Sequence, residues 1–168
     1  DRTAEILAAV GGRSAGTGDA EEWAAGRFAG PYLRDALLDA GVFCETLETA
    51  TTWSNLRTLK EAVEGALRDG FDAADARSYV MCHVSHVYPT GASLYFTVLA
   101  GLRQDPLGAW TVVKGRVNDA ILANGGTISH HHAVGRDHAP WLAQEIGDTG
   151  VRILTAVKRE LDPRGIMN

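Results

Sequence analysis

Three consecutive histidines, His130, His131 and His132, are the residues of this 168-residue chain whose type and spacing most directly suggest chemistry. They make up half of the chain's six histidines, and glycines stand on both sides of the run. Imidazole is the side chain that titrates near physiological pH, so neighbouring rings can transfer protons and bind anions. The flanking glycines allow the backbone to approach a flat or charged ligand. The pattern favours a ligand-binding site.

Two other interpretations of the histidine run need weighing. A structural cluster of packed imidazoles stays open as the second interpretation. A metal site is disfavoured, because adjacent residues of an extended chain point to opposite faces. The run also lacks the cysteine or carboxylate neighbours and the spacing of zinc motifs. We therefore predict no metal site, and we favour a ligand site over a structural cluster.

The composition limits the class of protein. With 45% hydrophobic and 22% charged residues, the chain is typical of a globular domain. The net charge of -5 offers no basic surface for nucleic acid, and no apolar run is long enough to cross a bilayer. Cys44 and Cys82 are too few for a disulfide framework, which favours a reducing, cytoplasmic location with both thiols buried. Because the chain starts at Asp1 without methionine, we expect it to be part of a longer polypeptide.

Periodicity and turn residues predict an α+β fold in which helices pack on one face of an antiparallel sheet. Leu56, Leu59, Val63 and Leu67 form one face of a helix that should end at Gly70. The other expected helices cover residues 3–10, a segment opening at Asp19, 31–41, 107–124 and 149–161. The expected strands cover residues 42–50, 78–88 and 92–102. We expect Leu107 to face inward in its helix, and Leu154, Val157 and Leu161 to be buried in the last one.

The last two strands should form a hairpin through the turn residues 89–91. If Tyr88 lies opposite Ala92, then Ser85 pairs with Tyr95 and His83 with Thr97, all on one polar face. The opposite face is apolar and should be buried. His86 falls on that apolar side, so we interpret it as a core histidine with a backbone partner.

Several segments together resemble one family. In order, they are Tyr32-Leu33-Arg34-Asp35, Glu45-Thr46-Leu47-Glu48-Thr49-Ala50, Trp53, Ser93-Leu94-Tyr95-Phe96, Asp105-Pro106-Leu107, residues 121–126, Ser129 to Gly135, and residues 156–163. Their order and approximate spacing are similar to the C-terminal half of the FAD-linked oxidases of the vanillyl-alcohol-oxidase type. Within that family the resemblance is greatest to the alkyldihydroxyacetonephosphate synthases of ether-lipid synthesis.

The resemblance implies an architecture for the chain. Residues 1–168 would be the C-terminal substrate-binding, or cap, region, a ferredoxin-like sheet with helices on one face, truncated here, plus C-terminal helices. The cofactor would be FAD, held mainly by a separate N-terminal domain that is absent from this chain. By itself the chain would be catalytically inactive.

The resemblance also assigns roles to individual residues. Tyr95 and the histidine run would be catalytic, and Arg34 and His83 would bind the substrate. His131, His132 and Asn124 would contact FAD. A phenol beside an imidazole can move a proton, and an arginine can hold a phosphate or carboxylate with two parallel hydrogen bonds. Two positions depart from the family pattern: Ala133 stands where glycine is usual, and His83 where the animal synthases carry a different basic residue.

The family's synthases exchange the acyl chain of acyl-dihydroxyacetone phosphate for a fatty alcohol without net redox change, and this is the first functional hypothesis. The second is an FAD-linked oxidase or dehydrogenase of a 2-hydroxy acid or another alcohol. A third, from a different class, is a non-catalytic module that binds an anionic ligand. The expected partner is a small lipid or phosphate substrate, with membrane-surface association and a homodimer as open options.

Overall fold

The computed structural model describes residues 1–101 and 105–167, so Leu102, the predicted end of a strand, lies outside the described residues. The chain divides into two compact units, Asp1–Asp39 and Ala40–Asn168. The first unit contains helices α1 (Arg2–Ala9), α2 (Gly18–Gly26) and α3 (Gly30–Asp39). Helix α2 begins after Thr17, whose hydroxyl donates to Glu21 at 2.8 Å, and therefore starts before the predicted Asp19.

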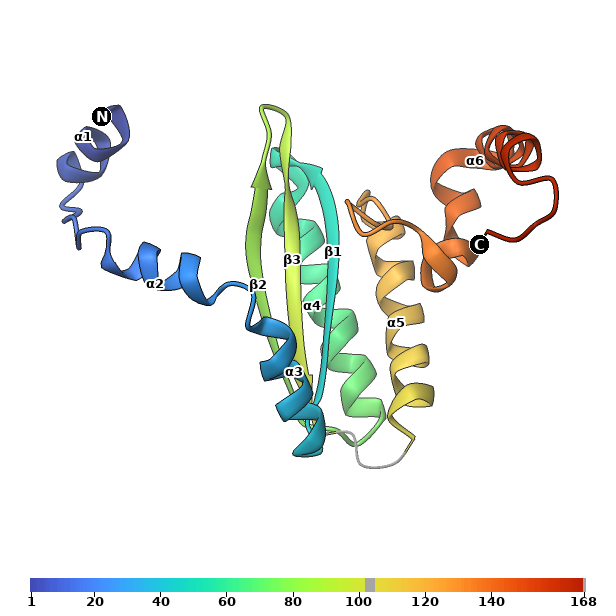
Figure 1. The fold of residues 1–168 in the computed structure, drawn as a ribbon, viewed down its shortest axis with the longest axis horizontal. Coiled ribbons are helices and arrows are strands. Elements are labelled where there is room, and N and C mark those ends of the chain that lie inside the picture. Colours follow the sequence, from blue (N-terminus) through green and yellow to red (C-terminus); the bar gives the residue numbers. More distant parts are fainter. Residues whose placement is uncertain (102–104, 168) are drawn as a thin grey trace. The chain divides into compact units, whose positions relative to one another are not determined.

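The second unit carries a three-stranded antiparallel sheet in the order β1-β3-β2 (Figure 1). Its elements in chain order are β1 (Phe43–Thr52), the short 3-10 helix η1 (Trp53–Asn55), α4 (Leu56–Ala73), β2 (Ser78–Val87), β3 (Gly91–Ala100), α5 (Pro106–Ala123) and α6 (Gly135–Leu161). The predicted α+β class is thereby confirmed.

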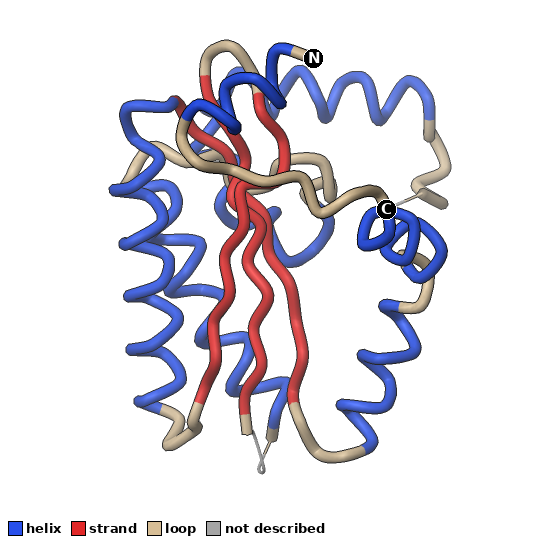
Figure 2. Tube along the Cα trace, turned by 90° about the vertical axis from the view of Figure 1, so that its left-hand side faces the viewer, coloured by secondary structure: helices blue, strands red, loops and turns tan. Residues whose placement is uncertain are grey.

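One face of the sheet carries the hydrophobic core. Helix α4 contacts all three strands, and α5 packs against α4. Figure 2 shows this helical layer beside the strands. In each element the buried side chains recur at the backbone period, every two residues in the strands and about every 3.6 residues in the helices. The buried apolar residues include Leu47, Leu94, Phe96, Val98, Leu59, Val63, Leu67, Phe71, Val113, Val117 and Ile121. The other face of the sheet is left for polar side chains.

Helix α4 continues past Gly70, so the predicted end of this helix is wrong. Gly70 is buried, and a Cβ there would lie 3.1 Å from a methyl group of Val113 in α5. The glycine therefore allows the two helices to approach closely. Leu107, predicted to face inward, is 76% exposed at the start of α5.

Helix α6 differs most from the prediction. It begins at Gly135 and is interrupted at Gly147, where φ is 72°. Leu154, Val157 and Leu161 are exposed, although their spacing predicted burial. An amphipathic pattern identifies an apolar face but does not show what covers it. No helix among the described residues combines the length and apolarity of a bilayer-crossing segment.

Candidate functional site

The polar face of the β2-β3 hairpin brings His83 and Tyr95 into direct cross-strand pairing, with ring centroids 6.0 Å apart. The predicted pairings, His83 with Thr97 and Ser85 with Tyr95, are therefore wrong in register by two residues. The turn is tighter than expected, because the Tyr88 N–H donates to the Gly91 carbonyl at 2.8 Å. A shift of two residues preserves the face of each side chain.

The second cause of the register shift is an irregularity in β2 between Val84 and Val87. Such a bulge places one extra residue in the strand and changes the face of the residues that follow it. His86 therefore lies on the polar face, where its N–H donates to the Ser93 hydroxyl at 2.9 Å. The interpretation of His86 as a core histidine is wrong.

The segment 124–134, named here the histidine loop, follows α5 and is bound along the edge strand β1. The Thr127 N–H donates to the Ala50 carbonyl at 3.0 Å, and the Thr49 hydroxyl donates to the Thr127 carbonyl at 2.7 Å. On its other side, the carboxylate of Glu145 in α6 accepts from the Thr127 hydroxyl at 2.6 Å and from the Ile128 N–H at 2.7 Å. These bonds fix the position from which the histidine run starts.

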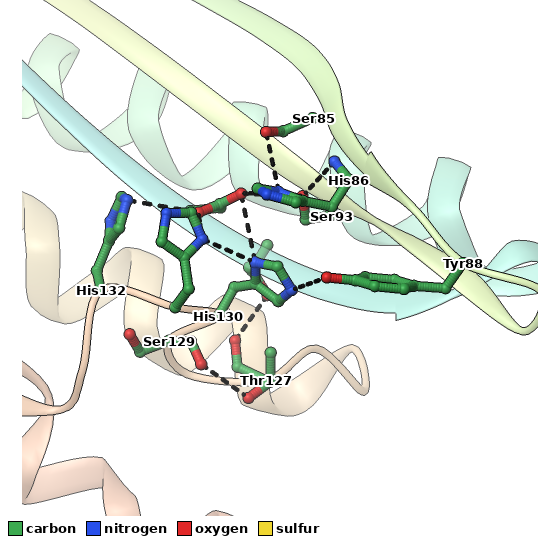
Figure 3. Close-up of polar contacts among 11 residues, drawn as sticks. Ser85, His86, Tyr88, Ser93, Thr127, Ser129, His130 and His132 are labelled. Atoms are coloured by element: carbon green, nitrogen blue, oxygen red, sulfur yellow. Dashed lines mark hydrogen bonds and ion pairs between the residues drawn. The ribbon is translucent and has the colours of Figure 1, made fainter.

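One buried carboxylate lies at the centre of the histidines. Glu48 stands on the polar face of β1, directly opposite Tyr95, and its side chain is fully buried. Its Oε1 accepts from the Ser93 hydroxyl at 2.9 Å and lies 3.4 Å from Nδ1 of both His86 and His130. Its Oε2 lies 2.8 Å from Nδ1 of His131 and 3.4 Å from Nε2 of His132. Four imidazoles thus surround one carboxylate (Figure 3).

The cluster of Glu48 and these four histidines extends to two tyrosines. The Tyr88 hydroxyl lies 3.1 Å from Nε2 of His130, at hydrogen-bond distance. On the other side, the ring of His132 meets that of Tyr95 edge to face, with centroids 5.9 Å apart. Tyr95 in turn neighbours His83. The structure therefore brings together His83, Tyr95 and the whole histidine run.

The pKa of Glu48 is lowered from its ordinary value. Burial alone raises this pKa, but the hydrogen bond from Ser93 and the charges of His131, His130 and His132 together lower it by more. The carboxylate is therefore ionised at neutral pH.

The cluster has a donor set that a divalent transition metal accepts. Glu48, His86, His130 and His131 offer ligand atoms that all lie within 4.8 Å of one another. They could therefore hold a metal ion, and the expectation of a metal-free site stays a prediction. As the cluster stands, ion-pair and hydrogen-bond contacts account for its arrangement.

A cavity of about 320 Å³ adjoins the cluster and is lined in part by Glu48 and His132. Lys114 of α5 and His138 of α6 also line it. Burial lowers the pKa of Lys114 more than nearby carboxylates raise it. The pKa of His138 is lowered by burial and by the charge of Lys114. This cavity gives small polar molecules a route to one side of the cluster.

Two further predicted site residues come from other segments of the chain. Arg34 is on α3, within the unit Asp1–Asp39, so its contact with substrate stays a prediction. Asn124 ends α5, where its side-chain amide donates to the Ala120 carbonyl at 2.8 Å. Its main-chain carbonyl accepts from Asn55 at 2.6 Å. Asn124 therefore holds the start of the histidine loop, and its contact with FAD also stays a prediction.

Sequence reasoning missed Glu48, His86 and Glu145. The signal for Glu48 was a charged residue in the middle of a strand, in phase with Thr46 and Ala50. Charged side chains are uncommon at central strand positions unless they have partners. No comparable signal marked His86 or Glu145.

Residues 2–168 match the family described as FAD linked oxidases, C-terminal domain. The chain belongs to this family. Among its relatives, the alkyldihydroxyacetonephosphate synthase of Dictyostelium discoideum is 28% identical over 165 residues, which are 98% of this chain and 27% of that protein. The synthase of Caenorhabditis elegans is 34% identical over 143 residues, or 83% of this chain and 24% of that protein.

A solved structure of an alkyldihydroxyacetonephosphate synthase matches this FAD-linked oxidase C-terminal domain with a TM-score of 0.64 and 25% identity. The match covers 96% of this chain and 27% of that one. The chain therefore spans about a quarter of the length of the relatives it matches.

Proposed function

We propose that this chain is the substrate-binding region of an FAD-dependent enzyme that exchanges the acyl chain of acyl-dihydroxyacetone phosphate for a fatty alcohol. The observation that carries the proposal is the common wall formed by Tyr95, His83 and the histidine run. The names of the relatives support the choice of reaction. The FAD-binding part belongs to the rest of the full-length protein.

In this proposal Tyr95 and His132 move the proton at the substrate carbon that exchanges its chain. Their rings meet edge to face with centroids 5.9 Å apart, so the phenol and the imidazole stand side by side on the wall. Ring N–H groups of the histidine run donate hydrogen bonds to negative charge that develops on the substrate. His83 binds the substrate on this wall. Arg34 is a further substrate-binding residue, since a guanidinium matches a phosphate or carboxylate with paired hydrogen bonds.

The residues on this wall fit a flavin. Oε2 of Glu48 is buried and accepts no hydrogen bond from the described residues, and imidazole nitrogens lie beside it. Such donors and acceptors suit the polar edge of the isoalloxazine ring. His131, His132 and Asn124 would contact the cofactor. When bound, FAD supplies the redox-active ring at which the exchange takes place.

The second candidate is an oxidase or dehydrogenase of a 2-hydroxy acid or another alcohol. The family description, FAD linked oxidases, supports this candidate. One experiment on the full-length protein separates the two. Exchange of a labelled fatty alcohol into acyl-dihydroxyacetone phosphate without loss of flavin absorbance supports the synthase. Anaerobic bleaching of the flavin by a 2-hydroxy acid, with no exchange, would refute the synthase and support the oxidase.

The role of Tyr95 is tested by Tyr95→Phe, which should lower turnover by roughly 100-fold, as expected for loss of a positioned proton-transfer group. Tyr79→Phe is the matched control, since Tyr79 is an exposed tyrosine on β2. Flavin content should stay the same in both variants. Equal turnover in the two variants would remove Tyr95 from the proposed chemistry.

A further inference from the structure

We propose that the cavity between β1, α5 and the start of α6 binds a small oxyanion, a phosphate or carboxylate group, and that Lys114 is the residue that contacts it. The cavity adjoins Glu48 and His132, so the anion site lies next to the histidine run. That the anion belongs to the substrate rests on the function proposed above. Binding of an anion as such does not.

The first observation is a buried cation without a counter-charge. Lys114 stands in the middle of α5 and lines the cavity, and only 9% of its surface is exposed. Its ammonium lies 5.9 Å from the ring centroid of Trp110 but forms no hydrogen bond or ion pair with the described residues. The other two lysines of the chain, Lys60 and Lys158, each contact a carboxylate at 2.6 Å. A buried cation without a partner is unfavourable, and an anion in the cavity would supply that partner.

The second observation is the start of α6, where Gly135 and Arg136 also line the cavity. The first N–H groups of a helix have no acceptor within the helix, and the partial positive charge there attracts anions. No side chain caps α6, and the His138 N–H donates to the Val134 carbonyl at 3.2 Å. The N–H groups of residues 135–137 are left without an acceptor among the described residues, and are therefore available to a ligand.

The carboxylates around the cavity do not neutralise Lys114. Burial lowers its pKa, and the charges of Asp137 and Glu45 offset only part of this effect. Neither carboxylate forms an ion pair with the ammonium among the described residues, and Oε2 of Glu45 accepts from the Thr46 N–H at 3.0 Å instead. The cation thus keeps its capacity to bind an anion directly.

The lining also limits the kind of molecule that fits. The volume of about 320 Å³ is at the lower end of small-molecule pockets, which span about 300–1,000 Å³. Charged side chains and the hydroxyls of Thr46 and Ser129 make up much of the lining, so an alkyl chain is a poor occupant. Lys114, Arg136 and the helix N–H groups together are donors that suit the several oxygens of a phosphate or carboxylate.

An anion held by Lys114 has a use in either candidate reaction. Acyl-dihydroxyacetone phosphate carries a phosphate, and a 2-hydroxy acid carries a carboxylate. Because Glu48 and His132 line the same cavity, the rest of a molecule anchored at Lys114 can extend toward the histidine run. Lys114 would then select substrates by their charged group.

The test is binding to the full-length protein, purified without phosphate and measured by isothermal titration calorimetry. The probes are inorganic phosphate, dihydroxyacetone phosphate and uncharged dihydroxyacetone. Lys114→Met removes the cation and keeps an unbranched side chain, and Lys60→Met is the matched control, because Lys60 lies on α4 and pairs with Glu64. Wild type and Lys60→Met should bind both phosphate compounds but not dihydroxyacetone. Lys114→Met should bind them at least about 10-fold more weakly, the usual loss with one charge-assisted hydrogen bond.

The relative affinities identify the source of the anion. Tighter binding of dihydroxyacetone phosphate than of inorganic phosphate assigns the site to the substrate head group, and equal binding assigns it to a free anion. Equal affinities of Lys114→Met and wild type would overturn the proposal, as would a wild type that binds neither phosphate compound.

A second measurement applies if Lys114→Met does not fold. In a crystal structure of the wild type with phosphate, an anion in contact with Lys114 supports the proposal, and anions bound only elsewhere overturn it. Absence of alkyl exchange in the full-length protein would contradict the proposed reaction and leave these binding results unchanged.

Discussion

Gly126 of the histidine loop lies in close contact with the core, and replacing it by alanine should loosen the loop. A Cβ there would lie 2.8 Å from the Thr49 hydroxyl oxygen, 2.9 Å from a methyl of Leu59 and 3.0 Å from a methyl of Ile121. All three neighbours are buried, so none can move away freely. The main chain of the loop must shift instead.

The size of the effect follows from these contacts. Overpacking a filled core by one methyl group costs about 1–3 kcal/mol. Displacing Thr49 also weakens its hydrogen bond to the Thr127 carbonyl, which contributes about 1 kcal/mol. We expect Gly126→Ala to lower the free energy of unfolding by about 2–3 kcal/mol. For a chain of this size the Tm should fall by roughly 4–12 °C.

Urea denaturation and thermal unfolding, followed by circular dichroism, measure this change. Gly65→Ala is the matched control, because a Cβ at this position of α4 meets nothing within 4 Å. The control should raise the stability by about 0.5–1 kcal/mol, the usual gain when alanine replaces glycine within a helix. If both variants were equally stable, the close approach of the loop to the core would be refuted.

Three further predictions concern single side chains. Ala133 has a φ of 65°, in the left-handed region, so Ala133→Gly should raise the free energy of unfolding by about 0.5–1 kcal/mol in urea; a decrease would contradict this. Because the pKa of Glu48 is lowered from 4.5, its ionised form stabilises the fold above that pH, and this contribution is lost as the pH falls through the folded value. The stability difference between wild type and Glu48→Gln should therefore shrink on acidification, and a constant difference would count against the ionised state. Burial raises the pKa of Cys82 from 9.0 to about 11, so its alkylation by iodoacetamide at neutral pH, followed by peptide mass spectrometry, should be about 100-fold slower than that of a free thiol. Equal rates would show that the surroundings of this half-buried thiol do not raise its pKa.

Much of the fold could be predicted because periodicity depends on local sequence. The apolar faces of β2, β3 and α4 follow directly from alternating or 3.6-residue spacing. The pairing register could not be predicted, since it depends on the tight turn before Gly91 and on the extra residue near Ser85. The exposed face of α6 could not be predicted either, because an amphipathic pattern does not identify its partner.

Part of the candidate site could also be predicted from the sequence, and part could not. The histidine run stands out in the sequence by residue type alone. Its carboxylate partner, Glu48, precedes it by 82 positions (130 − 48), and only the folded chain shows that the two meet. Glu145, which holds the start of the loop, lies before residue 149, where the last helix was expected to begin. Helix α6 gives that carboxylate its fixed position.

The irregular step in β2 has a consequence for comparing chains of this family. His83 and His86 are three positions apart, an odd spacing that would normally send two strand residues to opposite sides. Here both side chains lie on the polar face of the sheet. A sequence comparison based on alternating faces would therefore assign His86 to the interior. Deleting Ser85 would restore regular alternation and leave the two histidines two positions apart, so His86 would keep its side of the sheet while the bulge disappeared.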